Sequence, residues 1–187
     1  MNARIFIGLP LTDNYQNLLA EHVKDYADHP KIRLIDPQNY HLTLCFIGDI
    51  STNVLQNVLS TVQFICNRHK SFTLSFNRIS LAPAKRDARM IWAKFLVEPA
   101  FSELSNDLCQ IFTQLQIDHK HHSRPIPHVT LARFPEGKPP QLTLKKIPKR
   151  MLICNQVYVW QSTIEAGKRL YKPLQIYTLK QKMDKNR

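Results

Sequence analysis

A four-residue pattern, His-x-Thr-Leu, occurs twice in this chain, once beginning at His41 and once at His128, each time within a strand-like apolar segment. Side chains alternate between the two faces of a β-strand, so His41 and Thr43 should project from one face and the intervening leucine from the other. The same alternation pairs His128 with Thr130. Each copy therefore predicts a strand with a polar face and an apolar face, and the repetition is consistent with two related lobes.

The spacing of apolar residues divides the rest of the chain into helices and strands. Helical spacing covers roughly residues 12–28, 52–68 and 99–116. Further strand-like segments span residues 3–11, 40–48, 71–79, 88–97, 152–162 and 170–179. Helices dispersed among this many strands predict an α+β fold with sheets on one face and helices on the other. With only four glycines and no Ser/Gly-rich linker, residues 1–187 are expected to form a single domain.

The sequence gives little indication of a membrane-spanning segment or of disulfide bonds. No apolar run approaches the roughly 18 residues that cross a bilayer, and the short apolar start lacks a cleavage site, so we expect a cytoplasmic protein without a membrane partner. The four cysteines, Cys45, Cys66, Cys109 and Cys154, form no C-x-x-C pair and should be free, buried thiols. Cys45 shares a strand with His41, which leaves a nucleophilic cysteine as the alternative to packing.

The positive charge is concentrated late in the chain. Residues 133–187 hold 13 Lys and Arg against three acidic residues, and so carry most of the net charge of +12. A basic face on a small protein indicates a polyanion partner, because phosphates are the usual target of such a field. The alternative is a solvated surface that ends in a basic tail.

The two tetrads suit acid/base chemistry at phosphorus. Imidazole, with an ordinary pKa of about 6.5, can accept a proton in one copy and donate one in the other near neutral pH. Threonine hydroxyls can hold phosphate oxygens. Neither tetrad has a carboxylate at ligand spacing, so no metal and no other cofactor is expected. The run that contains His119, His121 and His122 is the alternative metal site, although histidines mixed with Lys and Arg are more typical of an exposed turn.

Three segments, HLTLCFIGD, RPIPHVTLAR and VYVWQSTIEAGKRLYKPLQIYTL, resemble the 2H phosphoesterase superfamily, and most closely its RNA 2′,3′-cyclic phosphodiesterases, also known as 2′-5′ RNA ligases. The resemblance implies a bilobal, pseudo-two-fold fold in which two antiparallel β-sheets line a central cleft and helices cover the outer faces. It implies hydrolysis of RNA 2′,3′-cyclic phosphate ends to 2′-phosphomonoesters, with 2′-5′ ligation as the reverse reaction. We expect a monomer that acts on such RNA ends, tRNA fragments included.

The resemblance also implies a role for each polar residue of the tetrads. His41 would donate a proton to the departing 3′ oxygen, and His128 would accept one from the attacking water. Thr43 and Thr130 would hold the phosphate oxygens.

Arg133 matches a basic position of the family and would bind the phosphate as well. Its parity along the strand is opposite to that of His128 and Thr130, so it reaches the cleft only if the strand bulges or ends near Ala132. Phe134 has the cleft-facing parity, which leaves base stacking and core packing as its two interpretations.

Two other functions also fit the sequence. One is a non-catalytic RNA-binding module that uses the same basic face and is indifferent to both histidines. The other is a phosphodiesterase of the same superfamily that acts on ADP-ribose 1″,2″-cyclic phosphate or on 2′-5′ oligoadenylate.

Overall fold

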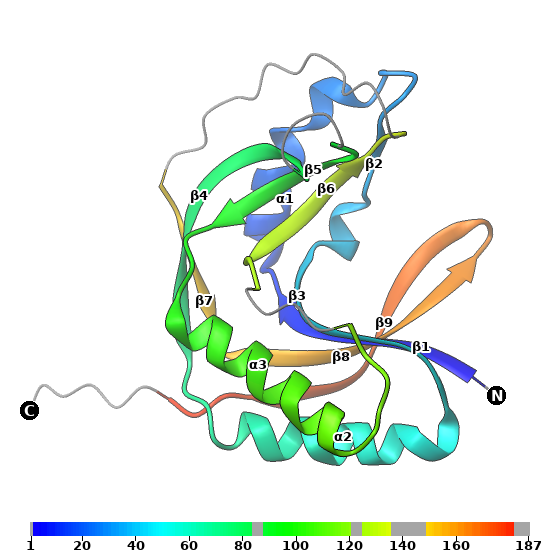
Figure 1. Cartoon of the computed structure of the whole chain (residues 1–187). Helices are drawn as coiled ribbons and strands as arrows, with labels where there is room; N and C mark the ends of the chain where they lie inside the picture. The colour runs from blue at the N-terminus through cyan, green and yellow to red at the C-terminus, as the bar shows by residue number, and fades with distance from the viewer. Residues whose placement is uncertain (1, 84–87, 121–124, 136–148, 182–187) are drawn as a thin grey trace, which may run out of the picture.

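The computed structural model describes residues 2–83, 88–120, 125–135 and 149–181, which form two antiparallel sheets and three α-helices (Figure 1). The four-stranded sheet has the order β3-β1-β8-β9 and the five-stranded sheet the order β2-β6-β5-β4-β7. All pairings between these strands are antiparallel, so the predicted α+β class with two antiparallel sheets is confirmed. The strands are β1 (Asn2–Pro10), β2 (Arg33–Leu34), β3 (His41–Ser51), β4 (Phe72–Ala82), β5 (Met90–Phe95), β6 (His128–Arg133), β7 (Met151–Cys154), β8 (Gln156–Glu165) and β9 (Lys168–Thr178).

The helices cover the outer faces of the sheets. In Figure 1, α2 (Thr52–Cys66) and α3 (Pro99–Gln114) lie below the four-stranded sheet, and α1 (Asp13–Glu21) lies behind the five-stranded sheet. Buried side chains of both sheets and all three helices belong to one continuous hydrophobic core, which ties the two lobes together. None of the helices in the described ranges is long and apolar enough to cross a membrane.

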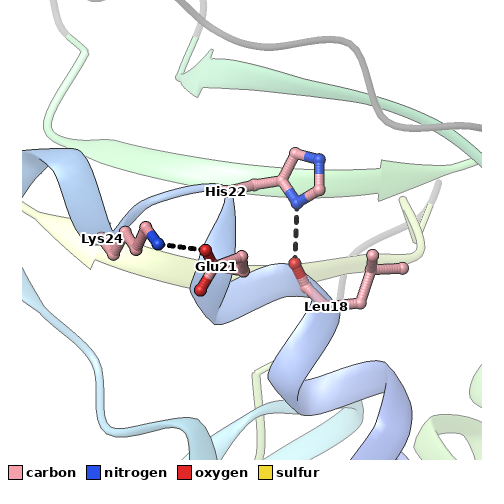
Figure 2. A network of polar contacts seen from close by, with 4 residues as sticks. All are labelled: Leu18, Glu21, His22 and Lys24. Atoms are coloured by element: carbon pink, nitrogen blue, oxygen red, sulfur yellow. Dashed lines mark hydrogen bonds and ion pairs between the residues drawn. The ribbon is translucent and has the colours of Figure 1, made fainter.

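The first helix is shorter than its apolar spacing predicts. It ends at Glu21, where the backbone tightens from i→i−4 to i→i−3 hydrogen bonds, and the chain continues as a 3₁₀ turn, η1 (Lys24–Tyr26). Figure 2 shows the local cause: the His22 ring contacts the carbonyl oxygen of Leu18 at 2.7 Å, and Lys24 pairs with Glu21. The His22 side chain thus satisfies the Leu18 carbonyl, which a continuing helix would have used for its next hydrogen bond.

The predicted strand at residues 152–162 is also wrong in one respect. Asn155 divides it into β7, which pairs with β4, and β8, which pairs with β1. The chain therefore crosses from one sheet to the other at this residue, and the alternation of buried residues changes parity there, from Leu152 and Cys154 to Val157 and Val159.

Candidate active site

Both tetrads line one central cleft between the sheets, with a volume of about 320 Å³. All five residues named from the sequence lie on its surface: His41, Thr43, His128, Thr130 and Arg133. The other described lining residues are Arg4, Phe6, Ile35, Asn39, Phe46, Met90, Ser162, Arg169 and Tyr171, so this lining includes three arginines and no carboxylate. Such a cleft suits an anion.

A bulge in β6 brings Arg133 to the cleft. Thr130 pairs with Trp92 and Ala132 pairs with Ile91, so Leu131 has no partner of its own on β5. Leu131 and Ala132 are consecutive buried residues, and the alternation resumes with the opposite parity after them. Arg133 therefore lies on the same side of the strand as Thr130, which was the condition for its side chain to reach the cleft.

The first tetrad carries the same irregularity at the same place. Thr43 pairs with Gly8 and Cys45 pairs with Ile7, which leaves Leu44 without a partner on β1. Leu44 and Cys45 are both buried, and Phe46 returns to the cleft. Phe46 thus occupies in the first lobe the position that an arginine holds in the second.

Each histidine ring is fixed by a main-chain carbonyl two residues before it. Nδ1 of His41 lies 2.7 Å from the carbonyl oxygen of Asn39, and Nδ1 of His128 lies 2.7 Å from that of Ile126. A carbonyl oxygen only accepts, so Nδ1 carries the hydrogen in both rings. Nε2 is then the nitrogen left to exchange a proton in the cleft, and in His41 it lies 3.1 Å from the Thr43 hydroxyl.

Aromatic side chains surround the His41 ring. Its centroid is 4.6 Å from that of Phe6, 5.1 Å from that of Tyr171 and 5.5 Å from that of Trp160. Burial lowers the pKa of His41 to about 4, against the opposing hydrogen bond to the Asn39 carbonyl. The nearby His128 and Arg133 of the second lobe contribute to this lowering of the pKa. In the free protein this ring is neutral at physiological pH.

The ring of His128 has a different environment. It stacks on the indole of Trp92, with centroids 3.6 Å apart and an angle of 20° between the planes. The ammonium group of Lys94 lies 5.5 Å from the centre of the same indole. One face of the imidazole is thus supported by an aromatic platform.

Asn39 links the first histidine to the β8–β9 hairpin. Its side-chain nitrogen donates to the carbonyl oxygen of Arg169 at 2.8 Å, and its side-chain oxygen accepts from the backbone nitrogen of Tyr171 at 3.2 Å. Because its own carbonyl accepts from His41, this one residue ties the imidazole to a strand far away in the sequence. No periodic pattern marks Asn39. Its position two residues before the tetrad is the one signal available in the sequence.

Two alternatives from the sequence lose their support in this geometry. Phe134 is buried in the core and does not line the cleft. Cys45 lies on the core side of its strand with Sγ 3.4 Å from Sγ of Cys109, and this contact together with burial raises the pKa of the Cys45 thiol. It is therefore a neutral packing residue, and all four cysteines are free and buried, as predicted.

The histidine-rich run does not assemble a metal site within the ranges that the structure describes. His119 bonds through Nδ1 to the carbonyl oxygen of Ile117 at 2.8 Å. His121 and His122 lie outside the described residues.

Comparison with known proteins agrees with this fold. The model of the LigT-like phosphoesterase family matches residues 9–92, which contain the first tetrad. The chain is 27% identical over 135 residues to an RNA 2′,3′-cyclic phosphodiesterase of Aquifex aeolicus, covering 70% of each chain. It is 25% identical over 138 residues to the enzyme of the same name from Methanothermobacter thermautotrophicus, covering 71% of this chain and 72% of the relative.

Solved structures extend the likeness in fold over nearly the whole chain. A protein of Thermus thermophilus superposes with a TM-score of 0.78 at 19% identity, covering 95% of this chain and 98% of its own. E. coli LigT complexed with 3′-AMP gives a TM-score of 0.72 at 22% identity, with coverages of 97% and 100%. The chain is thus similar to LigT-like phosphoesterases in the sequence of residues 9–92, and it shares the fold of the solved LigT structures over nearly its whole length.

Proposed function

We propose that this protein opens RNA 2′,3′-cyclic phosphate ends to 2′-phosphomonoesters by acid/base catalysis with His41 and His128. The observation that carries the proposal is the pair of imidazoles in one cleft, each with Nδ1 bonded to a main-chain carbonyl. Hydroxyl and guanidinium groups complete a donor set that fits a phosphate. The curated relatives bear the name of this activity.

In the proposed reaction His128 accepts a proton from water through Nε2, and the water oxygen forms a bond to phosphorus. The bond from phosphorus to the 3′ oxygen breaks, and His41 delivers its Nε2 proton to that oxygen. The product carries a 3′-hydroxyl and a 2′-phosphate. Thr43, Thr130 and Arg133 donate hydrogen bonds to the other phosphate oxygens as charge develops on them.

His41 must carry a second proton to act as the acid, although its pKa in the free protein is only about 4. A phosphate anion bound against Nε2 favours the imidazolium, because an opposite charge nearby stabilises the charged form of the ring. Substrate binding itself would therefore create the proton donor. The aromatic side chains around the ring strengthen this attraction by keeping water away.

The same geometry would accommodate the expected 2′-5′ ligation. A 5′-hydroxyl of a second RNA can replace the water beside His128, and its attack on phosphorus gives a 2′-5′ linkage with the same 3′ leaving group. We further propose a single-domain monomer of two lobes, because every group used in these steps comes from one chain.

The test is to incubate the purified protein with adenosine 2′,3′-cyclic phosphate in EDTA and to identify the product by phosphorus NMR. We expect adenosine 2′-phosphate at an undiminished rate. Formation of the 3′-phosphate, or loss of activity in EDTA, would contradict the proposal.

The same assay separates the rival functions. ADP-ribose 1″,2″-cyclic phosphate and 2′-5′ oligoadenylate are tested beside the cyclic nucleotide, and the highest kcat/KM identifies the substrate class. An RNA-binding module would turn over none of them and would bind RNA equally well without either histidine.

A further inference from the structure

A second hollow, of about 870 Å³, adjoins the central cleft. It lies between residues 20–40 and the first part of β9, in the β8–β9 hairpin that projects from the four-stranded sheet in Figure 1. Asn39, Arg133, Arg169 and Tyr171 line both this hollow and the cleft. A chain-like ligand whose end lies at the histidines would therefore have this hollow beside it.

The charge of this hollow, which we call the basic groove, is strongly positive. Its basic lining residues are Lys24, Arg33, Arg133, Lys168 and Arg169, and its one carboxylate is Asp36, which is occupied by the backbone nitrogen of Gln38 at 3.0 Å. Lys24 is paired with Glu21, which leaves four cations without a carboxylate partner in the described part of the chain.

Other hollows of similar size differ in charge. The one between α2 and β9, of about 440 Å³, has no charged residue among its described lining. The one between α2 and the end of α3, of about 660 Å³, contains Asp49 and Asp118. Positive charge is thus a property of the groove beside the cleft, not of every hollow on a basic protein.

The pairing of β2 with β6 gives an independent indication of an anionic ligand. Arg33 lies directly opposite Arg133 in this antiparallel pair, and both side chains are exposed and line the basic groove. Like charges directly opposite each other destabilise a sheet. Within the described ranges neither guanidinium makes an ion pair with a carboxylate, so a bound phosphate is the group that would relieve the repulsion.

We propose that the basic groove binds the phosphodiester backbone of the RNA strand that leads to the reacting end. This inference rests on the proposed function and adds that the preferred substrate is an oligonucleotide, not a cyclic mononucleotide. The terminal ribose lies at the histidines, and its 5′ oxygen continues to the next phosphate. Arg133 stands where cleft and groove meet, while Arg33 and Lys168 contact phosphates farther along the strand. These contacts are to backbone phosphates and give affinity without reading the base sequence.

The experiment compares two substrates, adenosine 2′,3′-cyclic phosphate and a tetranucleotide with the same cyclic end, in the unaltered protein and in the double variant Arg33→Gln/Lys168→Gln. The quantity of interest is the ratio of kcat/KM for the tetranucleotide to kcat/KM for the mononucleotide. We expect this preference to fall about tenfold in the double variant at low salt. The dependence of log kcat/KM on log salt for the tetranucleotide should become less steep by about 0.7 for each phosphate contact removed.

The control double variant is Arg78→Gln/Lys180→Gln, which removes two exposed cations that line neither the cleft nor the basic groove. It should keep the full preference. An unchanged preference in Arg33→Gln/Lys168→Gln, or an unaltered protein that prefers the mononucleotide, would overturn the inference.

Failure of the proposed function looks different, because then neither substrate is hydrolysed. In that case the fluorescence anisotropy of the labelled tetranucleotide, measured with the same two double variants, still tests whether the basic groove binds the RNA strand. Binding that weakens in the groove variant alone supports it, and binding that is equal in both variants refutes it.

Discussion

The two halves of the cleft share a backbone and differ in their surroundings. Each has a histidine at the first residue of a strand, a bulge after the threonine and a carbonyl bond that orients the ring. The residue paired with the threonine is Gly8 in the first half and Trp92 in the second. The first ring is enclosed by three aromatic side chains, whereas the second stacks on one.

This difference separates two properties of a catalytic pair. The repeated motif supplies equivalent geometry, with Nδ1 of each ring bonded to a main-chain carbonyl and both rings lining one cleft. In the proposed reaction the distinction between acid and base would come from residues outside the motif, because burial lowers the pKa of His41 and two of the rings around it, Trp160 and Tyr171, belong to β8 and β9. Equivalent motifs can therefore perform unequal proton transfers.

The most severe way to break the pair is to remove either imidazole. His41→Gln and His128→Gln should each lower kcat on a 2′,3′-cyclic nucleotide by about a thousandfold, since general acid or base catalysis contributes roughly 10²–10⁴. His22→Gln is the matched control, because His22 bonds to the end of α1 and does not line the cleft. A histidine variant that kept a tenth of the activity would remove that residue from the mechanism.

The next effect concerns the backbone beside the first tetrad. A Cβ at Gly8 would lie 2.2 Å from the carbonyl oxygen of Leu42, so Gly8→Ala must push β1 away from β3, the strand that carries His41. We expect it to lower the free energy of unfolding by about 3 kcal/mol in urea titrations and to reduce turnover.

Gly167→Ala is the comparison for this substitution. Gly167 has a φ of +75° but open space around it, so alanine there should cost only about 1 kcal/mol. Equal losses in the two variants would mean that the contact with Leu42 does not constrain the strand pair.

The threonines test whether both halves hold the phosphate. Thr43→Val and Thr130→Val should each lower kcat/KM about tenfold, the loss of one hydrogen bond to a charged group, while Thr→Ser restores most of it. Circular dichroism provides the control for folding. Full activity in either valine variant would show that its hydroxyl does not contact the phosphate.

The smallest expected effect concerns the pKa of His41, which a titration of the free protein measures directly. The NMR signal of the His41 ring should titrate with a midpoint near pH 4 in the free protein, and inorganic phosphate should move this midpoint upward. Between about pH 6.5 and 4 the unfolded chain binds this proton and the folded chain does not, so the contribution of His41 lowers the free energy of unfolding as the pH falls. A midpoint at 6.5 or above would contradict the enclosed environment.

Local periodicity explains what the sequence could predict. The polar faces of both tetrads, α2 and α3 follow from side-chain spacing alone, and the parity of Arg133 correctly identified a bulge as the condition for its reaching the cleft. The features that the sequence could not predict depend on which strands pair with each other. β2 has two residues and no alternation to detect, the change of sheet at Asn155 depends on which strands pair with the segments on either side, and the bulge that returns Phe46 to the cleft depends on which residues of β1 face it.

The link from Asn39 to β9 has a consequence for the order in which the site is made. Synthesis proceeds from the N-terminus, so both histidines exist before Trp160 and Tyr171 are added to the chain. Until the β8–β9 hairpin reaches Asn39, the His41 ring lacks two of the three aromatic side chains that enclose it. The enclosure of the first histidine is therefore completed only after β8 and β9 have been added to the chain.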